Sequence, residues 1–310
     1  MSNCSFKEVN DFMSSIYLVI YIPTFVVGLI LNSLALVVFC VMLKKWTEST
    51  IYMTNLALMD LLLLLPLPFK MHASMNKWSS DKKTACSFLE SLYFVSMYGS
   101  IFTIMCISVD RYIGIKHPFK AKVLRSPKKA LIVCIVIWVA VWAGTAPVYG
   151  FHSEQEPGAD VFRCFHGFSK DSWSIPVILN LEIIGFLIPM LVMVFCTIQI
   201  IITLKKSEQN RENSQAGIRI IYANLFVFLV SFTPSHLGIF LQFLVRRDFI
   251  EDCSSKLNIS LFVQVTMCLA NVTCCLDAIC YYFITKEIRS TSGSFRRSRS
   301  HRINSTTTEV

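Results

Sequence analysis

Acidic side chains interrupt the apolar stretches of this chain at four positions, and one of the same stretches carries a lysine. These residues are Asp60, Lys70, Glu90, Glu182 and Asp277. An ionised side chain in apolar surroundings is costly unless it is paired, binds a ligand or gives up its charge. The chemistry that such residues support is therefore ion binding, proton transfer or recognition of a charged ligand. Lys70 in particular favours an anionic ligand.

The composition places these residues in a membrane protein. Of the 310 residues, 54% are hydrophobic and 16% are charged, and the mean hydropathy is +0.56. Soluble chains carry about 25% charged residues, so this chain has too much apolar surface for one soluble core. The net charge of +9 would by itself also suit a nucleic-acid binder, so the location of the charges decides what it means.

Seven apolar stretches are long enough to cross a membrane, which takes about 20 residues. The predicted spans are residues 17–43, 51–69, 88–112, 130–149, 175–204, 218–245 and 259–284. The loops are too short to fold alone, so the spans predict one all-α, seven-helix bundle. We expect residues 1–16 to form an N-terminal segment, residues 17–284 the transmembrane domain and residues 285–310 a tail.

The loop charges set the orientation of this bundle. Most of the 29 Lys and Arg residues fall in the loops and the tail on the side opposite the N-terminus. Because basic loops stay in the cytoplasm, the N-terminus is predicted to be extracellular and the protein a multi-pass protein of the plasma membrane. The positive charge thus faces the cytoplasm and its anionic lipids, and no nucleic-acid partner is expected.

Four of the 12 cysteines lie on the predicted outer side, where the environment is oxidising. Four cysteines allow three pairings. We favour Cys86 with Cys164, which ties the second outer loop over the mouth of the bundle, and Cys4 with Cys253. Free thiols are the alternative. On the same side, Asn3 and Asn258 begin Asn-x-Ser sequons and are the predicted glycosylation sites.

The inner end of the third span carries the tripeptide Asp110-Arg111-Tyr112. An arginine at that depth is costly alone, and an adjacent carboxylate lowers the cost. A pair of this kind makes a switch if it can be broken, because the released Arg111 becomes available to a cytoplasmic partner. The alternative is a basic residue that only sets orientation, next to an acid by chance.

Together with other residues in the correct spans, this tripeptide resembles the rhodopsin-like G-protein-coupled receptors over residues 17–290. The resemblance rests on Asn32, Asp60, Cys86, Asp110-Arg111-Tyr112, Trp138, Pro189, Phe232-x-Pro234 and Asp277-x-x-x-Tyr281. Two departures stand out: Phe232 replaces the usual tryptophan, and Asp277-Ala278 replaces Asn-Pro. With an aspartate at this position, the chain resembles the branch of the family that contains the nucleotide, protease-activated and lysolipid receptors.

The resemblance implies a switch and an ion site. The switch would consist of Asp110, Arg111, Tyr112, Phe232, Pro234 and Tyr281. The family places Asp60 near Asp277, with Ser100 beside them, and two ionised carboxylates need a cation or a shared proton. We expect a structural sodium ion or a proton there, and no other cofactor. One permanently protonated carboxyl group is the alternative.

The outer half of the bundle is the predicted ligand pocket. Its candidate contacts are Lys70, Glu90, Tyr93, Met97, His166, Glu182, His236, Phe240, Arg246 and Arg247. Cations beside an apolar lining suit an anionic lipid or a small organic anion. Local runs resemble the orphan-receptor subgroup that includes the lysophosphatidylinositol receptor and its kynurenate-responsive relative. This resemblance implies a lipid or a small organic anion, and we favour a lysophospholipid. Snorkelling at the membrane interface is an equal interpretation of Arg246 and Arg247.

The cytoplasmic side carries the candidate signalling contacts. By resemblance, Arg111, Pro118 and Phe119 would contact a heterotrimeric G protein, of the Rho-activating class first and the inhibitory class second, and arrestin would also bind. For Phe119, anchoring at the membrane interface is an equal alternative. A short amphipathic helix is expected from Lys286, and Thr308 and Val310 fit a C-terminal ligand of PDZ domains, although so short a motif also arises by chance.

Two other classes of protein deserve comparison. A seven-helix ion or proton transporter would also need intramembrane acids. The lack of an inverted repeat and the presence of the Asp110-Arg111-Tyr112 tripeptide argue against it. An enzyme is not expected, because the chain has neither a His-Glu-x-x-His nor a Gly-x-Ser-x-Gly motif.

Overall fold

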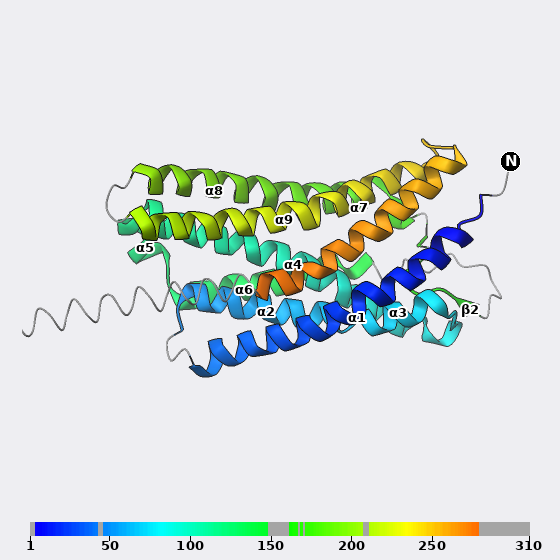
Figure 1. Cartoon of the computed structure of the whole chain (residues 1–310), viewed down its shortest axis with the longest axis horizontal. Helices are drawn as coiled ribbons and strands as arrows, with labels where there is room; N and C mark the ends of the chain where they lie inside the picture. Colours follow the sequence, from blue (N-terminus) through cyan, green and yellow to red (C-terminus); the bar gives the residue numbers. More distant parts are fainter. Residues whose placement is uncertain are drawn as a thin grey trace, which may run out of the picture.

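The computed structural model describes residues 4–42, 46–147, 161–166, 168–169, 171–206 and 211–278, with the side chains of residues 211–220 left aside. Within these residues, seven helices are long and apolar enough to cross a membrane, and we call them spans one to seven. They are Lys7–Met42, Glu48–Met75, Ser80–Lys116, Pro127–Gly144, Ile175–Lys206, Ile221–Arg246 and Cys253–Ala278. They pack side by side (Figure 1), which confirms the predicted bundle.

Several spans consist of more than one regular element. Span one is α1 (Lys7–Val37) followed by a π-helical turn, Val38–Met42. Span two is α2 (Glu48–Leu64) and α3 (Leu67–Met75), and span three is α4 (Lys83–Lys116) after a 3₁₀ turn, Ser80–Lys82. Span five joins α7 (Ile175–Leu179), a π-helical segment (Asn180–Leu187) and α8 (Ile188–Lys206). Span four is α6 (Pro127–Gly144), and α9 (Arg211–Arg246) contains span six.

Proline explains the division of span two. Pro66 lacks an amide hydrogen, so it cannot continue the hydrogen bonding of α2, but it suits the start of a new helix. The new helix is α3, where the amide of Lys70 donates to the carbonyl of Pro66 at 2.8 Å. Pro66 therefore fixes where Lys70 lies relative to the rest of span two.

The first helix begins well before the predicted start at residue 17, because the apolar stretch marks only the part of the helix inside the membrane. Its polar first turns also pack on the bundle. Met13 is buried, and Tyr17 Oη donates to Gln264 Oε1 of span seven at 2.9 Å. The disulfide between Cys4 and Cys253 holds the same region, as predicted.

Spans two and three form the centre of the bundle, and hydrogen bonds between side chains hold them in register. Asn55 Nδ2 of α2 donates to Thr103 Oγ1 of α4 at 2.8 Å, and Trp138 Nε1 of α6 donates to Asn55 Oδ1 at 2.8 Å. Asn32 of α1 donates to the backbone oxygen of Cys274 at 3.0 Å. Buried amides thus link the helices where apolar packing alone would let them slide.

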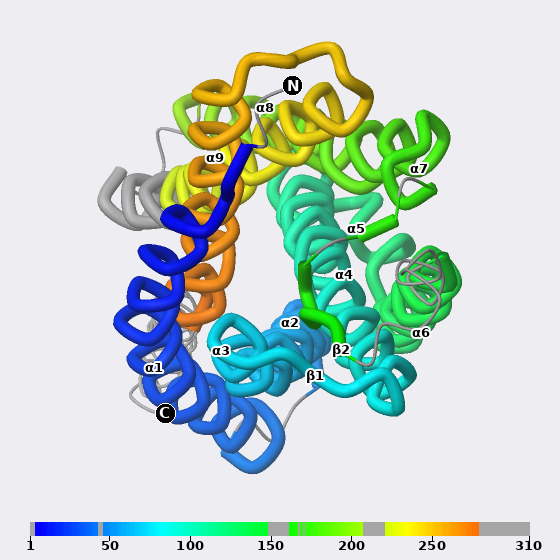
Figure 2. The backbone as a smooth tube through the Cα atoms, turned by 90° about the vertical axis from the view of Figure 1, so that its right-hand side faces the viewer, coloured from blue at the N-terminus to red at the C-terminus, as the bar shows by residue number. Residues whose placement is uncertain are grey.

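A short antiparallel pair closes the outer end of the bundle. Strand β1 (Trp78–Ser79) pairs with β2 (Val161–Phe162), so that Trp78 faces Phe162. The disulfide between Cys86 and Cys164, also predicted, lies beside this pair. In Figure 2, which views the bundle end-on, β2 lies across the ends of the helices near α3 and α4. The loop that contains β2 is therefore fixed over the mouth of the bundle.

Some of the predicted sites lie outside the described residues. They are Asn3, Tyr281, the short helix expected from Lys286, Thr308 and Val310. These sites stay predictions. The other predicted positions can all be located in the fold.

Candidate functional site

Lys70 lies in an aromatic cage at the outer end of the bundle. Its Nζ atom is 4.5 Å from the ring centroid of Tyr93, 5.6 Å from that of Tyr21 and 5.8 Å from that of Phe165. The residue is only 8% exposed. Among the described residues, no carboxylate lies within 4.0 Å of Nζ and none accepts a hydrogen bond from it. Glu90 acts on this charge only from beyond contact distance. A buried ammonium held against ring faces, with no acid in contact, suits an anion.

The walls of the cage come from parts of the chain that are far apart in sequence. Tyr21 belongs to α1, Tyr93 to α4, and Phe165 follows the loop cysteine Cys164. Asn271 of span seven donates to Tyr21 Oη at 3.1 Å and steadies that wall. Sequence reasoning identified Lys70 and Tyr93 but missed Tyr21 and Phe165. The position of Phe165, next to Cys164, was the only signal available for it.

Two other predicted residues lie close to the cage, in or under the loop. Glu90 is completely buried, and its Oε1 atom accepts a hydrogen bond from the backbone N–H of Phe165 at 2.8 Å. His166 Nδ1 donates to the carbonyl oxygen of Cys164 at 3.1 Å. Burial lowers the pKa of His166, and the charges of Lys70 and Arg163 lower it further, against the effect of this hydrogen bond. His166 is therefore a neutral hydrogen-bonding group at neutral pH.

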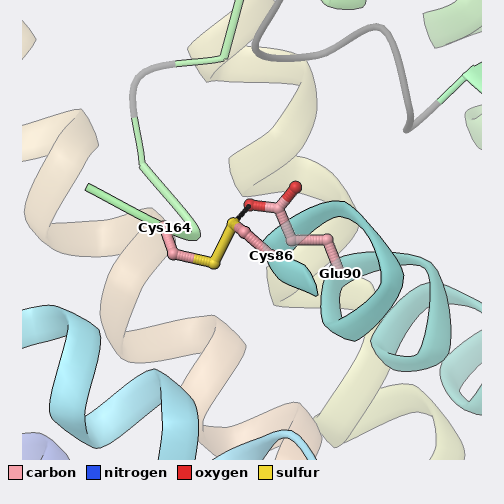
Figure 3. Close-up of side chains that lie close together, drawn as sticks. All are labelled: Cys86, Glu90 and Cys164. Atoms are coloured by element: carbon pink, nitrogen blue, oxygen red, sulfur yellow. Dashed lines mark hydrogen bonds between the residues drawn. A yellow bond between two sulfur atoms is a disulfide. The ribbon is translucent and has the colours of Figure 1, made fainter. Parts of the chain in front are cut away.

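The cluster of Glu90 with two cysteines is not a metal centre. Figure 3 shows the Glu90 carboxylate directed at the sulfur of Cys86, and Oε1 lies 3.4 Å from that atom. The ligand atoms of Cys86, Glu90 and Cys164 are within 4.8 Å of one another. Both sulfurs are engaged in the disulfide, so neither is a thiolate that could bind a metal, and neither carries a proton to donate.

Glu182 and His236 form a second polar cluster, between spans five and six. His236 Nδ1 lies 3.3 Å from Glu182 Oε2, and the ring of Phe186 stacks on His236 with centroids 4.3 Å apart. Tyr98 of α4 packs edge-on against the same imidazole. Within the described part of the chain, His236 Nε2, Glu182 Oε1 and the Tyr98 hydroxyl have no hydrogen-bond partner. Glu182 thus pairs with His236 and not with Lys70.

An apolar cleft of about 230 Å³ lies between spans three, four and five. Residues that line it include Phe94, Tyr98, Phe102, Val141, Leu181 and Ile184. Phe94 also packs edge-on against Tyr93, with ring centroids 5.7 Å apart. The cleft and the cage around Lys70 are therefore linked through two adjacent aromatic residues of α4.

The remaining predicted pocket residues lie elsewhere. Phe240 and Arg246 are in the outer part of span six, and Arg247 directly follows it. Phe240 is exposed, and Arg247 lies over the ring of Phe243. None of the three is among the walls of the cage. Met97 is buried and lines a smaller inner cavity.

That inner cavity brings the three predicted ion-site residues together. Asp60, Ser100 and Asp277 all line it, and its volume is about 10 Å³. Ser100 Oγ donates to Asp60 Oδ1 at 3.4 Å. Asp277 Oδ2 and Thr273 Oγ1 are buried and have no hydrogen-bond partner among the described residues. Two carboxylates and a void of about one water molecule suit a small cation or a shared proton.

At the cytoplasmic end, Asp110 holds Arg125, a partner that sequence reasoning missed. Arg125 Nε donates to Asp110 Oδ1 at 2.7 Å and Arg125 Nη2 donates to Oδ2 at 2.8 Å. Ser49 Oγ also donates to Oδ2, at 3.1 Å, and Glu48 lies 3.7 Å from Arg125. The predicted partner of Asp110 was the adjacent Arg111. The bidentate pair with Arg125 ties the second inner loop to span three.

Arg125 directly follows α5 (Pro118–Leu124), the helix of that loop. Burial lowers the pKa of Arg125, but the hydrogen bond and charge of Asp110 outweigh it and the pKa is raised, so the pair stays charged. Phe119 on the same helix is 84% exposed. Tyr112 Oη lies 3.3 Å from His117 Nε2. Phe232, which lies near Pro234 in span six, is buried. The loop therefore leaves the Phe119 ring without cover from the rest of the described chain.

Comparisons with known proteins extend over nearly the whole chain. Residues 31–281 match the family described as 7 transmembrane receptor (rhodopsin family). The chain is 47% identical over 304 residues to G-protein coupled receptor 55 of Homo sapiens, covering 96% of this chain and 93% of that protein. It is 34% identical over 289 residues to lysophosphatidic acid receptor 6 of Gallus gallus, covering 91% and 93%. It is 37% identical over 271 residues to G-protein coupled receptor 35 of Homo sapiens, covering 86% and 83%.

Proposed function

This chain belongs to the rhodopsin family of seven-transmembrane receptors, and we propose that its ligand is an anionic lysophospholipid, with lysophosphatidylinositol favoured, or a small organic anion. It is a multi-pass plasma-membrane protein that couples to G proteins, and it is not an enzyme. The relatives named as lysophosphatidic acid receptors support a lysophospholipid. The transporter alternative is not favoured.

The observation that carries the proposal is the buried ammonium group of Lys70. Its ammonium is buried among three rings, with no acid in contact among the described residues. A phosphate group would supply the missing negative charge and accept its hydrogen bonds. An acyl chain attached to that phosphate would pass Tyr93 and Phe94 and enter the apolar cleft between spans three, four and five. One ligand with an anionic head and an apolar tail thus satisfies both features.

For signalling, we propose that the ligand acts through Asp110, Arg111 and Tyr112 on a heterotrimeric G protein, of the Rho-activating class first and the inhibitory class second. Pro118 and the exposed Phe119 of α5 would contact that protein. Arrestin and a PDZ-domain protein are further proposed partners. Asp60, Ser100 and Asp277 would hold a sodium ion or a proton. If the site holds sodium, added sodium should change agonist affinity more in the wild type than in Asp60→Asn.

The test replaces Lys70 with methionine, which keeps the length of the side chain and removes its charge. We expect the potency of lysophosphatidylinositol in a Rho-pathway reporter to fall by about 10- to 100-fold, as for the loss of a charged hydrogen bond. Lys77→Met is the matched control, because Lys77 is exposed two residues beyond α3. Unchanged potency in Lys70→Met, at equal surface expression, would contradict the proposal.

A further inference from the structure

Phe165 has a backbone conformation that needs support. Its φ angle is 63°, in the left-handed region, which side chains with a β-carbon rarely adopt. The residue has neither the freedom of glycine nor the local side-chain hydrogen bonding of asparagine. The surrounding structure must therefore hold it in place, and such backbone strain is found mostly at functional sites.

Two groups from one turn of α4 hold this residue. Cys86 is bonded to Cys164, the residue before Phe165, and Glu90 accepts the N–H of Phe165 itself at 2.8 Å. Cys86 and Glu90 are four residues apart, so they lie on the same face of the helix. Figure 3 shows both side chains directed toward the loop. The disulfide fixes the loop covalently, and the carboxylate sets the peptide group that follows.

The strained residue supplies one wall of the cage. Its ring is 5.8 Å from Lys70 Nζ and stands edge-on to Tyr93, with ring centroids 6.4 Å apart at an angle of 80°. The direction of the ring depends on the backbone that carries it. If the peptide group turned over, the ring would leave the ammonium and the cage would open on that side.

We propose that Glu90 is a positioning residue of the ligand site: its carboxylate holds the Phe165 peptide group so that the Phe165 ring closes the cage over Lys70. This rests on the proposed function and gives Glu90 a role other than ligand contact. A carboxylate is a poor contact for an anionic head group, because the two repel each other. It is a strong acceptor for a buried backbone N–H, and here it has that bond.

Two substitutions at Glu90 separate this role from the others. Glu90→Gln keeps an oxygen that accepts the Phe165 N–H and removes the negative charge, whereas Glu90→Leu removes the acceptor. We expect lysophosphatidylinositol potency to be kept in Glu90→Gln, and to fall by about 10-fold or more in Glu90→Leu. A similar loss in both variants would show direct contact between the carboxylate and the ligand. A similar gain in both would show a role as counter-charge to Lys70 alone. Either result would overturn the proposal.

A second set of variants tests whether Glu90 acts through Phe165. Phe165→Ala keeps the backbone N–H and removes only the ring, so its loss should match that of Glu90→Leu. Because both changes open the same wall, the potency of lysophosphatidylinositol on the double variant should equal its potency on the less sensitive single variant, within about 2-fold. Losses that multiply would show two independent roles and contradict the inference.

A measurement without ligand keeps the inference separate from the proposed function. In the purified full-length receptor, hydrogen–deuterium exchange over residues 161–166 should be faster in Glu90→Leu than in the wild type, and unchanged in Glu90→Gln. If lysophosphatidylinositol does not activate the wild type, the proposed function fails and this readout still decides the role of Glu90. Equal exchange in all three proteins would contradict the positioning role.

Discussion

At the outer end of α4, Glu90 holds a loop through a backbone N–H, whereas at the inner end Asp110 holds a loop through an arginine side chain. The outer loop is also fixed by the disulfide of Cys86, and Glu90 is completely buried. The inner loop has no disulfide to α4 among the described residues, and the Arg125 side chain is 28% exposed. One helix thus carries a fixed loop on one side of the membrane and a releasable loop on the other.

The difference suits the two tasks of a receptor. A ligand site keeps its selectivity if its walls are set before the ligand arrives. A signalling surface must change, and an ion pair near solvent can exchange partners at little cost. Glu48, at 3.7 Å from Arg125, already offers that cation a second acid. We therefore expect ligand binding to leave the outer loop in place and to alter the inner loop.

Removing the covalent bond at the outer end should have the largest effect. A disulfide typically contributes about 2–4 kcal/mol, which corresponds to about 30- to 1,000-fold in the population of the ordered loop. Replacement of both Cys86 and Cys164 by serine should therefore reduce lysophosphatidylinositol potency by about 100-fold or more. The paired control, with Cys4 and Cys253 replaced, removes a disulfide outside the cage and should cost less. Equal losses at equal surface expression would show that the bonds act only on folding.

Breaking the ion pair at the inner end should have a smaller effect, and it should raise signalling, whereas the loss of the disulfide lowers agonist potency. Arg125→Gln removes the bidentate donor to Asp110, so we expect agonist-independent G-protein signalling to rise by about 2- to 5-fold. Lysophosphatidylinositol binding should stay within about 2-fold of the wild type. Lys122→Gln is the control, because Lys122 is exposed on the same loop helix. A fall in basal signalling would show that the pair supports the active arrangement.

The sequence predicted the elements of this comparison better than their contacts. Seven apolar stretches were enough for seven spans, because length and hydropathy are properties of each segment alone. Four cysteines on one side of the membrane left three pairings open, and the favoured pairing of Cys86 with Cys164 is the one in the structure. The start of span one did not follow, because its first turns are polar and pack on span seven.

The partner of Asp110 shows why contacts are harder to predict. Adjacency in sequence suggested Arg111, but neighbouring residues on a helix point in different directions. The partner in the structure, Arg125, directly follows another helix, and its guanidinium group packs closely against Gly114. A Cβ atom at Gly114 would lie 2.9 Å from Arg125 Nη1. Such a fit between a side chain and a gap left by glycine exists only in the folded chain.

The same limit applies to the cage. Lys70 could be identified from its own position in an apolar stretch, whereas Tyr21 and Phe165 could not, because nothing in α1 or in the loop marks them as neighbours of span two. The grouping of Asp60, Ser100 and Asp277 followed only from resemblance to the family, and the structure brings the three to one cavity.

The most direct test of the comparison measures both loops in one experiment. Hydrogen–deuterium exchange of the purified wild-type receptor, with and without lysophosphatidylinositol, reports on residues 161–166 and residues 118–125 together. We predict that the ligand accelerates exchange in the inner loop as the pair between Asp110 and Arg125 opens, and leaves exchange in the outer loop unchanged or slower. Faster exchange in the outer loop with no change in the inner loop would contradict the account.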